Sequence, residues 1–96
     1  MIERTINNAI IIPKEKIVET YNKFLLLENL FQKEDFKKED KLISLSFIPC
    51  EMDQEDIEEV CLILQDVFDS PRIFDEVYEM WRDLESYEEL ELVFYL

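Results

Sequence analysis

The chain has 96 residues, 48% of them apolar, and a formal net charge of −14. This length holds one small core and leaves little room for a second domain or a deep catalytic cleft. The apolar content, which includes seven Phe, four Tyr and one Trp, excludes a disordered acidic chain and indicates a single folded domain over residues 1–96.

The first third of the sequence predicts a strand followed by a helix. Apolar and polar residues alternate from Ile2 to Ile6, and Asn7-Asn8 then precedes an apolar run. This pattern fits either a short N-terminal hairpin or a single strand over Asn8–Ile12. Pro13 suits a helix start, and we expect a helix from Lys14 to about Phe31. Its apolar residues at helical spacing are Ile17, Val18, Tyr21, Phe24 and Leu25.

The middle of the sequence predicts a charged connection, a strand and a second helix. Residues 32–41 (QKEDFKKEDK) have no apolar periodicity, whereas Leu42–Ile48 (LISLSFI) alternates as a half-buried strand does. Pro49 ends that strand. Asp53 is a favourable N-cap for a helix that runs to about Phe68. The apolar stripe of this helix consists of Ile57, Val60, Cys61, Leu64, Val67 and Phe68.

The last third predicts one more helix and one more strand. Ser70-Pro71 combines a capping serine with a proline at the first helical position, so a helix should run from there to Leu84 or Ser86. Its buried face would contain Ile73, Val77, Met80, Trp81 and Leu84. Residues 90–96 (LELVFYL) are β-branched and aromatic enough for a strand.

This order of elements, β-α-β-α-α-β, favours an α+β fold with about three helices packed on one face of a small sheet of three or four strands. A mostly helical bundle is the alternative.

The charge is concentrated in one half of the chain. Residues 1–50 carry eight bases and eight acids and are neutral overall. Residues 51–96 carry sixteen acids and two bases, Arg72 and Arg82, so the whole net charge of −14 lies there. Such asymmetry between halves points to an interaction surface.

The acids of the two predicted helices are the candidates for that surface, and Glu58 and Glu59, which lie past the first turn, are the strongest of those on the first of these helices. Acids at a helix start suit the helix dipole, which explains residues 51–56. Like charges four residues apart, such as Asp75 and Glu79, cost a few tenths of a kcal/mol per pair. Binding to a partner explains them slightly better than the alternative, an acidic surface that only aids solubility. We predict partner contacts at Glu55, Glu58, Glu59, Asp75, Glu76, Glu79 and Asp83, with Tyr78 and Tyr87 as aromatic contacts.

The sequence gives little support for a catalytic, phosphate-binding or metal-binding site. The sequence has no histidine and no glycine, so the commonest general base and glycine-rich phosphate loops are absent. Cys50 and Cys61 lack the spacing of a disulfide framework or a zinc site, and Cys61 falls on an apolar stripe that indicates a buried thiol. We expect no enzyme activity, no cofactor and no metal ion.

The partner should be a protein. An acidic chain is unsuited to phosphates and to anionic lipids, and no stretch approaches the roughly 18 apolar residues of a membrane span. We therefore expect a cytoplasmic, stoichiometric inhibitor that occludes a basic, nucleic-acid-acting protein. It would be an immunity protein against a nuclease toxin or a phage-type anti-defence inhibitor. The alternative is a non-enzymatic subunit or adaptor that forms a homodimer or completes a sheet through residues 90–96.

Overall fold

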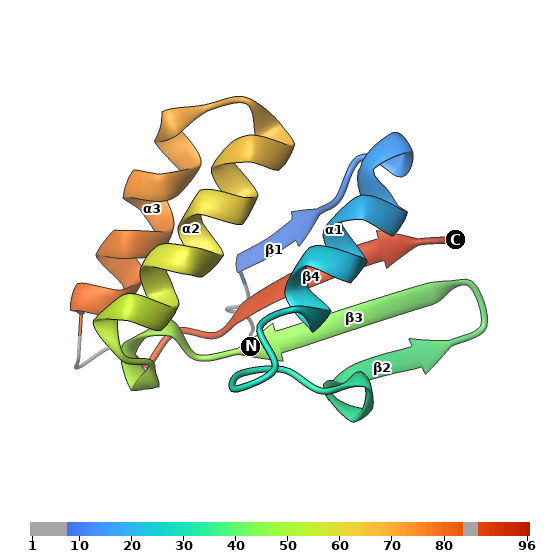
Figure 1. The fold of residues 1–96 in the computed structure, drawn as a ribbon, viewed down its shortest axis with the longest axis horizontal. Helices are drawn as coiled ribbons and strands as arrows, with labels where there is room; N and C mark the ends of the chain where they lie inside the picture. Colours follow the sequence, from blue (N-terminus) through green and yellow to red (C-terminus); the bar gives the residue numbers. More distant parts are fainter. Residues whose placement is uncertain (1–7, 84–86) are drawn as a thin grey trace, which may run out of the picture.

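The computed structural model describes residues 8–83 and 87–96. The strands are β1 (Asn8–Ile11), β2 (Phe36–Glu39), β3 (Leu42–Phe47) and β4 (Leu90–Tyr95). The α-helices are α1 (Ile17–Leu25), α2 (Gln54–Phe68) and α3 (Pro71–Arg82) (Figure 1). Short 3-10 turns precede α1, β2 and α2: η1 (Lys14–Lys16), η2 (Lys33–Asp35) and η3 (Pro49–Glu51).

The four strands form one mixed sheet in the order β1-β4-β3-β2. The last strand in the sequence, β4, lies inside the sheet, parallel to β1 and antiparallel to β3. Val93 of β4 lies opposite Ile11 of β1 on one side and opposite Ser44 of β3 on the other. The fold is therefore α+β, as predicted.

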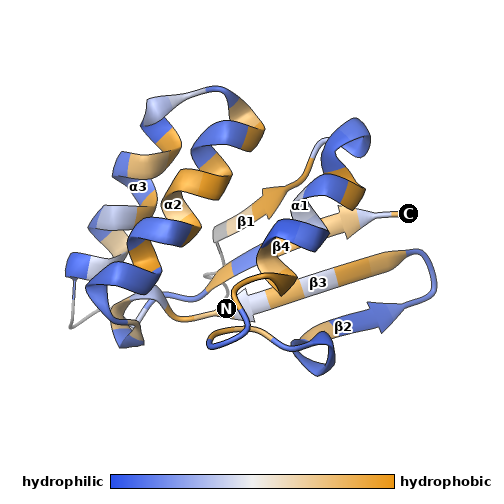
Figure 2. Cartoon of the chain, viewed as in Figure 1, coloured by the Kyte–Doolittle hydropathy of each residue, from blue (hydrophilic) through white to orange (hydrophobic). Residues whose placement is uncertain are grey.

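All three helices pack on the same face of this sheet. The core cluster takes Leu90, Leu92 and Phe94 from β4, which are alternate residues on one side of the strand. Their register partners Ile43 and Leu45 on β3 belong to the same cluster. Helix residues complete it, including Phe24 of α1, Leu64 of α2 and Val77 of α3. Figure 2 shows the corresponding apolar stretches on α1 and α2.

The first helix is shorter than the sequence predicted. It ends at Leu25, six residues before Phe31, and a turn-rich segment follows. Phe24 is fully buried, but Leu26, just past the helix end, is 77% exposed. Phe31 is buried beyond the helix end and packs edge-on against Phe24, with ring centroids 5.7 Å apart.

The starts of α2 and α3 match the prediction, but only one of the two expected caps forms a hydrogen bond. The backbone N–H of Arg72 donates to Ser70 Oγ at 3.3 Å, with Pro71 in the first turn. Asp53 occupies the N-cap of α2 with extended backbone angles, yet its side chain caps no backbone N–H. The predicted end of α3 at Leu84 or Ser86 lies outside the described residues, as do Ile2–Asn7 of the expected hairpin.

The segment 32–41 contains a strand that the sequence did not reveal. β2 pairs with β3 from Phe36, opposite Leu45, to Glu39, opposite Leu42. Phe36 is its one buried residue, and Lys37, Lys38 and Glu39 are exposed. An edge strand can carry such charges because it needs only one apolar contact to the core, and the charges discourage pairing with other chains. No helix in the described part of the chain is both long and apolar enough to cross a membrane.

Leu64 and Leu62, two neighbouring leucines of α2, test this arrangement. Leu64 is fully buried in the core, whereas Leu62 is 57% exposed. We expect Leu64→Ala to lower the free energy of unfolding by about 2–5 kcal/mol, because the truncation leaves a cavity. Leu62→Ala should change it by less than about 1 kcal/mol. Urea denaturation followed by the fluorescence of Trp81 measures both, and equal losses would contradict the described orientation of α2.

Candidate functional site

The acidic half of the sequence forms the α2–α3 pair, termed here the helical hairpin (residues 54–82), together with the adjoining turns and β4. The lysines lie elsewhere: Lys37 and Lys38 on β2 and Lys41 in the turn between β2 and β3. In Figure 1 the helical hairpin and β2 occupy opposite ends of the molecule. The charge asymmetry along the sequence is thus also an asymmetry in space.

The four acids predicted on α3 are all exposed. Asp75, Glu76 and Glu79 lie on the helix, and Asp83 is its C-cap. Two arginines reach them within the same helix: Arg72 Nε is 3.7 Å from Glu76 Oε1, and Arg82 Nη1 is 3.3 Å from Glu79 Oε1. Exposed pairs of this kind contribute little stability, so a partner can replace them at small cost.

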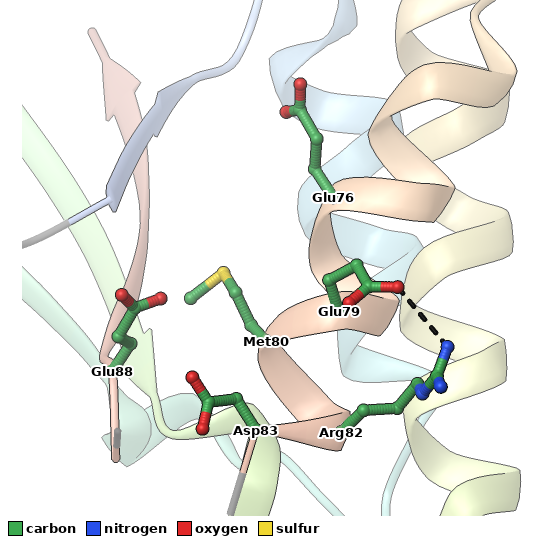
Figure 3. A pocket seen from close by; sticks show the side chains of 6 residues that line it. All are labelled: Glu76, Glu79, Met80, Arg82, Asp83 and Glu88. Atoms are coloured by element: carbon green, nitrogen blue, oxygen red, sulfur yellow. Dashed lines mark hydrogen bonds and ion pairs between the residues drawn. The ribbon is translucent and has the colours of Figure 1, made fainter. Parts of the chain in front are cut away.

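The end of α3 borders a surface depression of about 610 Å³, lined by Glu76, Glu79, Met80, Arg82, Asp83 and Glu88. In Figure 3 the side chains of Met80 and Asp83 reach toward Glu88, while Glu79 turns to Arg82. Glu88 is not among the residues predicted from the sequence. Its place depends on the pairing of β4, which brings the segment before Leu90 alongside the end of α3.

A second depression, of about 460 Å³, adjoins the first between α3 and the sheet. Six of its seven lining residues have apolar side chains, and it shares Glu76 and Met80 with the acidic depression. The remaining residues are Ala9, Ile10, Ile73, Val77 and Leu90. The two depressions together place exposed acids of α3 beside apolar side chains. This combination resembles the centre and edge of protein interfaces.

The three acids predicted on α2 do not share one side of that helix. Glu55 and Glu59 line a depression of about 310 Å³ with residues 26–30, on the side toward α1. Glu58 is half-buried on the side toward α3: it is one turn before Cys61, whose thiol lies 3.8 Å from the Phe74 carbonyl. The predicted acids therefore surround the helical hairpin instead of forming one flat face.

The aromatic candidates differ in their exposure. Tyr78 is half-buried, with its ring stacked on Phe74 at 5.8 Å and tilted against Trp81 at 5.1 Å. Trp81, expected in the core, is half-buried and donates its indole N–H to the Met52 carbonyl at 2.8 Å. Tyr87 is 60% exposed and has a φ of 50°, a region that bulky residues seldom adopt. Of the two predicted contacts, Tyr87 is the one presented to solvent.

One lysine of the neutral half does neutralise an acid of the helical hairpin. Lys23 Nζ of α1 donates to Asp66 Oδ2 of α2 at 2.7 Å. The hydrogen bond to Asp66 raises the pKa of Lys23, and the same bond lowers the pKa of Asp66. This pair links α1 to α2 across the surface and neutralises one acid of the helical hairpin.

Within residues 8–83 and 87–96, no three His, Cys, Asp or Glu side chains are grouped as a metal ion would require. The chain matches no protein-family model, no curated protein and no solved structure.

The two cysteines should differ strongly in reactivity. Burial raises the pKa of the Cys61 thiol to about 11, with a smaller contribution from Glu58. At pH 9 a thiol with that pKa is only about 1% ionised, so ionisation alone should slow its alkylation roughly 50-fold relative to an ordinary thiol. Cys50, which is only half-buried, should react first. Mass spectrometry of iodoacetamide-treated native protein measures this, and equal labelling of the two thiols would contradict the packing of α2 against α3.

Proposed function

We propose that this protein is a non-enzymatic, stoichiometric inhibitor that binds a basic, nucleic-acid-acting protein through its acidic helical hairpin. An immunity protein against a nuclease toxin and a phage-type anti-defence inhibitor both fit this description. The observation that carries the proposal is the confinement of the entire net charge of −14 to residues 51–96, which include α2 and α3.

The inhibition would act by occlusion. A nucleic-acid-acting protein grips phosphates with lysines and arginines, and those side chains would pair instead with exposed acids of α3. Glu76 and Glu79 are 63% and 71% exposed, so they can reach a partner without local unfolding. The mixed lining between α3 and the sheet would then supply apolar contacts, with Met80 as the residue common to both depressions.

The charge asymmetry would also orient the encounter. A basic partner would be attracted by the helical hairpin, whereas residues 33–41 around β2 carry four lysines and four acids and have no net charge. Approach from the acidic end is therefore favoured. Complementary charge raises association rates up to about 10⁸–10⁹ M⁻¹s⁻¹ at low salt. The affinity should fall as salt is added, because salt screens exposed charges.

A second candidate function is an adaptor that uses the C-terminal strand. β4 has β1 on one edge and β3 on the other, so it has no edge with which to complete the sheet of another chain. An adaptor of this kind would therefore have to bind its partner through the face of the sheet.

A panel assay tests the inhibitor proposal. Basic nucleases and other basic nucleic-acid-acting enzymes are assayed for activity with increasing amounts of this protein, at low and at high salt. We expect inhibition of a member of the panel to saturate at one equivalent, with weaker affinity at high salt. Enzymes that all keep full activity at low salt would contradict the proposal.

Charge-reversal variants test the location of the binding surface. Glu76→Lys with Glu79→Lys should weaken binding by about tenfold per reversed charge, a loss of about 1.4 kcal/mol each. The matched control is Glu15→Lys with Glu34→Lys, which changes the net charge equally at exposed positions before α1 and before β2. If both double variants weaken binding equally, total charge and not α3 determines the affinity.

A further inference from the structure

The sheet has a second face that none of the described helices covers. Alternate residues of every strand point to it, opposite to the core residues. They are Ala9 and Ile11 of β1, Lys37 and Glu39 of β2, Leu42, Ser44 and Ser46 of β3, and Glu91, Val93 and Tyr95 of β4. We call this set the open face.

The open face contains an apolar patch at one end. The register places Ile11 beside Val93, and Tyr95 beside Leu42, so these four side chains are neighbours across three strands. Ile11 is 58% exposed and Tyr95 is 53% exposed, while Val93 between them is only 7% exposed. The adjoining Leu96 is 58% exposed. Large apolar side chains gathered in this way mark an interaction surface more often than single exposed residues do.

The charge of the open face differs from that of the helical hairpin. It carries one base, Lys37, and two acids, Glu39 and Glu91, so it is nearly neutral. A basic partner therefore has little reason to choose this face over α3. A second copy of the same chain fits this face better, because a two-fold axis can bring Lys37 of each copy to Glu39 or Glu91 of the other.

We propose that the open face is a self-association surface on which two copies of this chain pack sheet against sheet. The two sheets would lie about 10 Å apart with their strands roughly aligned. Ile11, Tyr95 and Leu42 of both copies would form the centre of the contact, around the already buried Val93. Both helical hairpins then point outward, which leaves the acids of α3 accessible in the dimer.

The area of the open face limits how tightly two copies can bind each other. β1 and β2 have four residues each and β3 and β4 six each. At about 4.8 Å between strands and about 3.3 Å per residue, the face measures roughly 320 Å² per copy, or about 640 Å² in total. Stable interfaces bury about 1,200–2,000 Å², so the dimer should be weak and concentration-dependent, in the micromolar range or above. It should also strengthen with salt, because two chains of −14 repel each other until that charge is screened.

Sedimentation equilibrium over micromolar to millimolar protein, at low and high salt, tests this proposal. We expect the average mass to rise from monomer toward dimer with concentration, and to rise further with salt. Ile11→Lys with Tyr95→Lys should reduce association at least tenfold. The control Val18→Lys, at a 72% exposed position on α1, should leave association unchanged.

Circular dichroism first verifies that each variant is folded. If the lysine double variant does not fold, Ile11→Ser with Tyr95→Ser replaces it, with Val18→Ser as control. A wild-type protein that stays monomeric at millimolar concentration and high salt would overturn the proposal. So would a folded double variant that associates like the wild type. The salt response separates this surface from the inhibitor surface, since binding of a basic partner weakens with salt.

Discussion

The helices of this protein bury their apolar stripes against a single face of the sheet, and most of its surface chemistry follows from that packing. Leu90, Leu92 and Phe94 supply the core side of β4, and every α-helix contributes to the same cluster. The other sides of α2 and α3 must therefore face solvent, and the sequence fills them with acids. The opposite face of the sheet is left with a nearly neutral surface that contains an apolar patch.

The two proposed contacts should respond to salt in opposite directions. The helical hairpin carries like charges whose mutual repulsion only Arg72, Arg82 and Lys23 relieve through described ion pairs. Attraction to a basic partner is strongest when salt is low. Contact between two open faces, by contrast, is opposed by the net charge of both chains and gains from screening. The two proposed contacts would not exclude each other, because they use different layers of the fold.

Periodicity in the sequence was sufficient to predict the long elements. The stripe of α2 and the Ser70-Pro71 start of α3 depend on local spacing and capping, so they could be read directly. β2 could not be read in this way, because Phe36 is its only buried residue and its neighbours are lysines and a glutamate. The early end of α1 was also missed, since an apolar run such as Phe24–Leu27 fits a buried helix and a helix end equally well.

The candidate site was predictable as a set of residues but not as an arrangement. Exposure of Asp75, Glu76, Glu79 and Asp83 follows from helical spacing. The separation of Glu58 from Glu55 and Glu59 depends on which sides of α2 contact α1 and α3, and this is a tertiary property. Glu88 joins the α3 depression only because β4 returns to the centre of the sheet, which no local pattern indicates.

The most direct test of the central claim is a residue-level map of where a cationic ligand binds. Isotope-labelled protein would be titrated with a short arginine-rich peptide while the backbone amide signals are followed by NMR. The account predicts the largest shifts at Glu76–Asp83 and Glu88, with little change along β2. Shifts spread evenly over all exposed acids, or centred on residues away from α3 and Glu88, would contradict it.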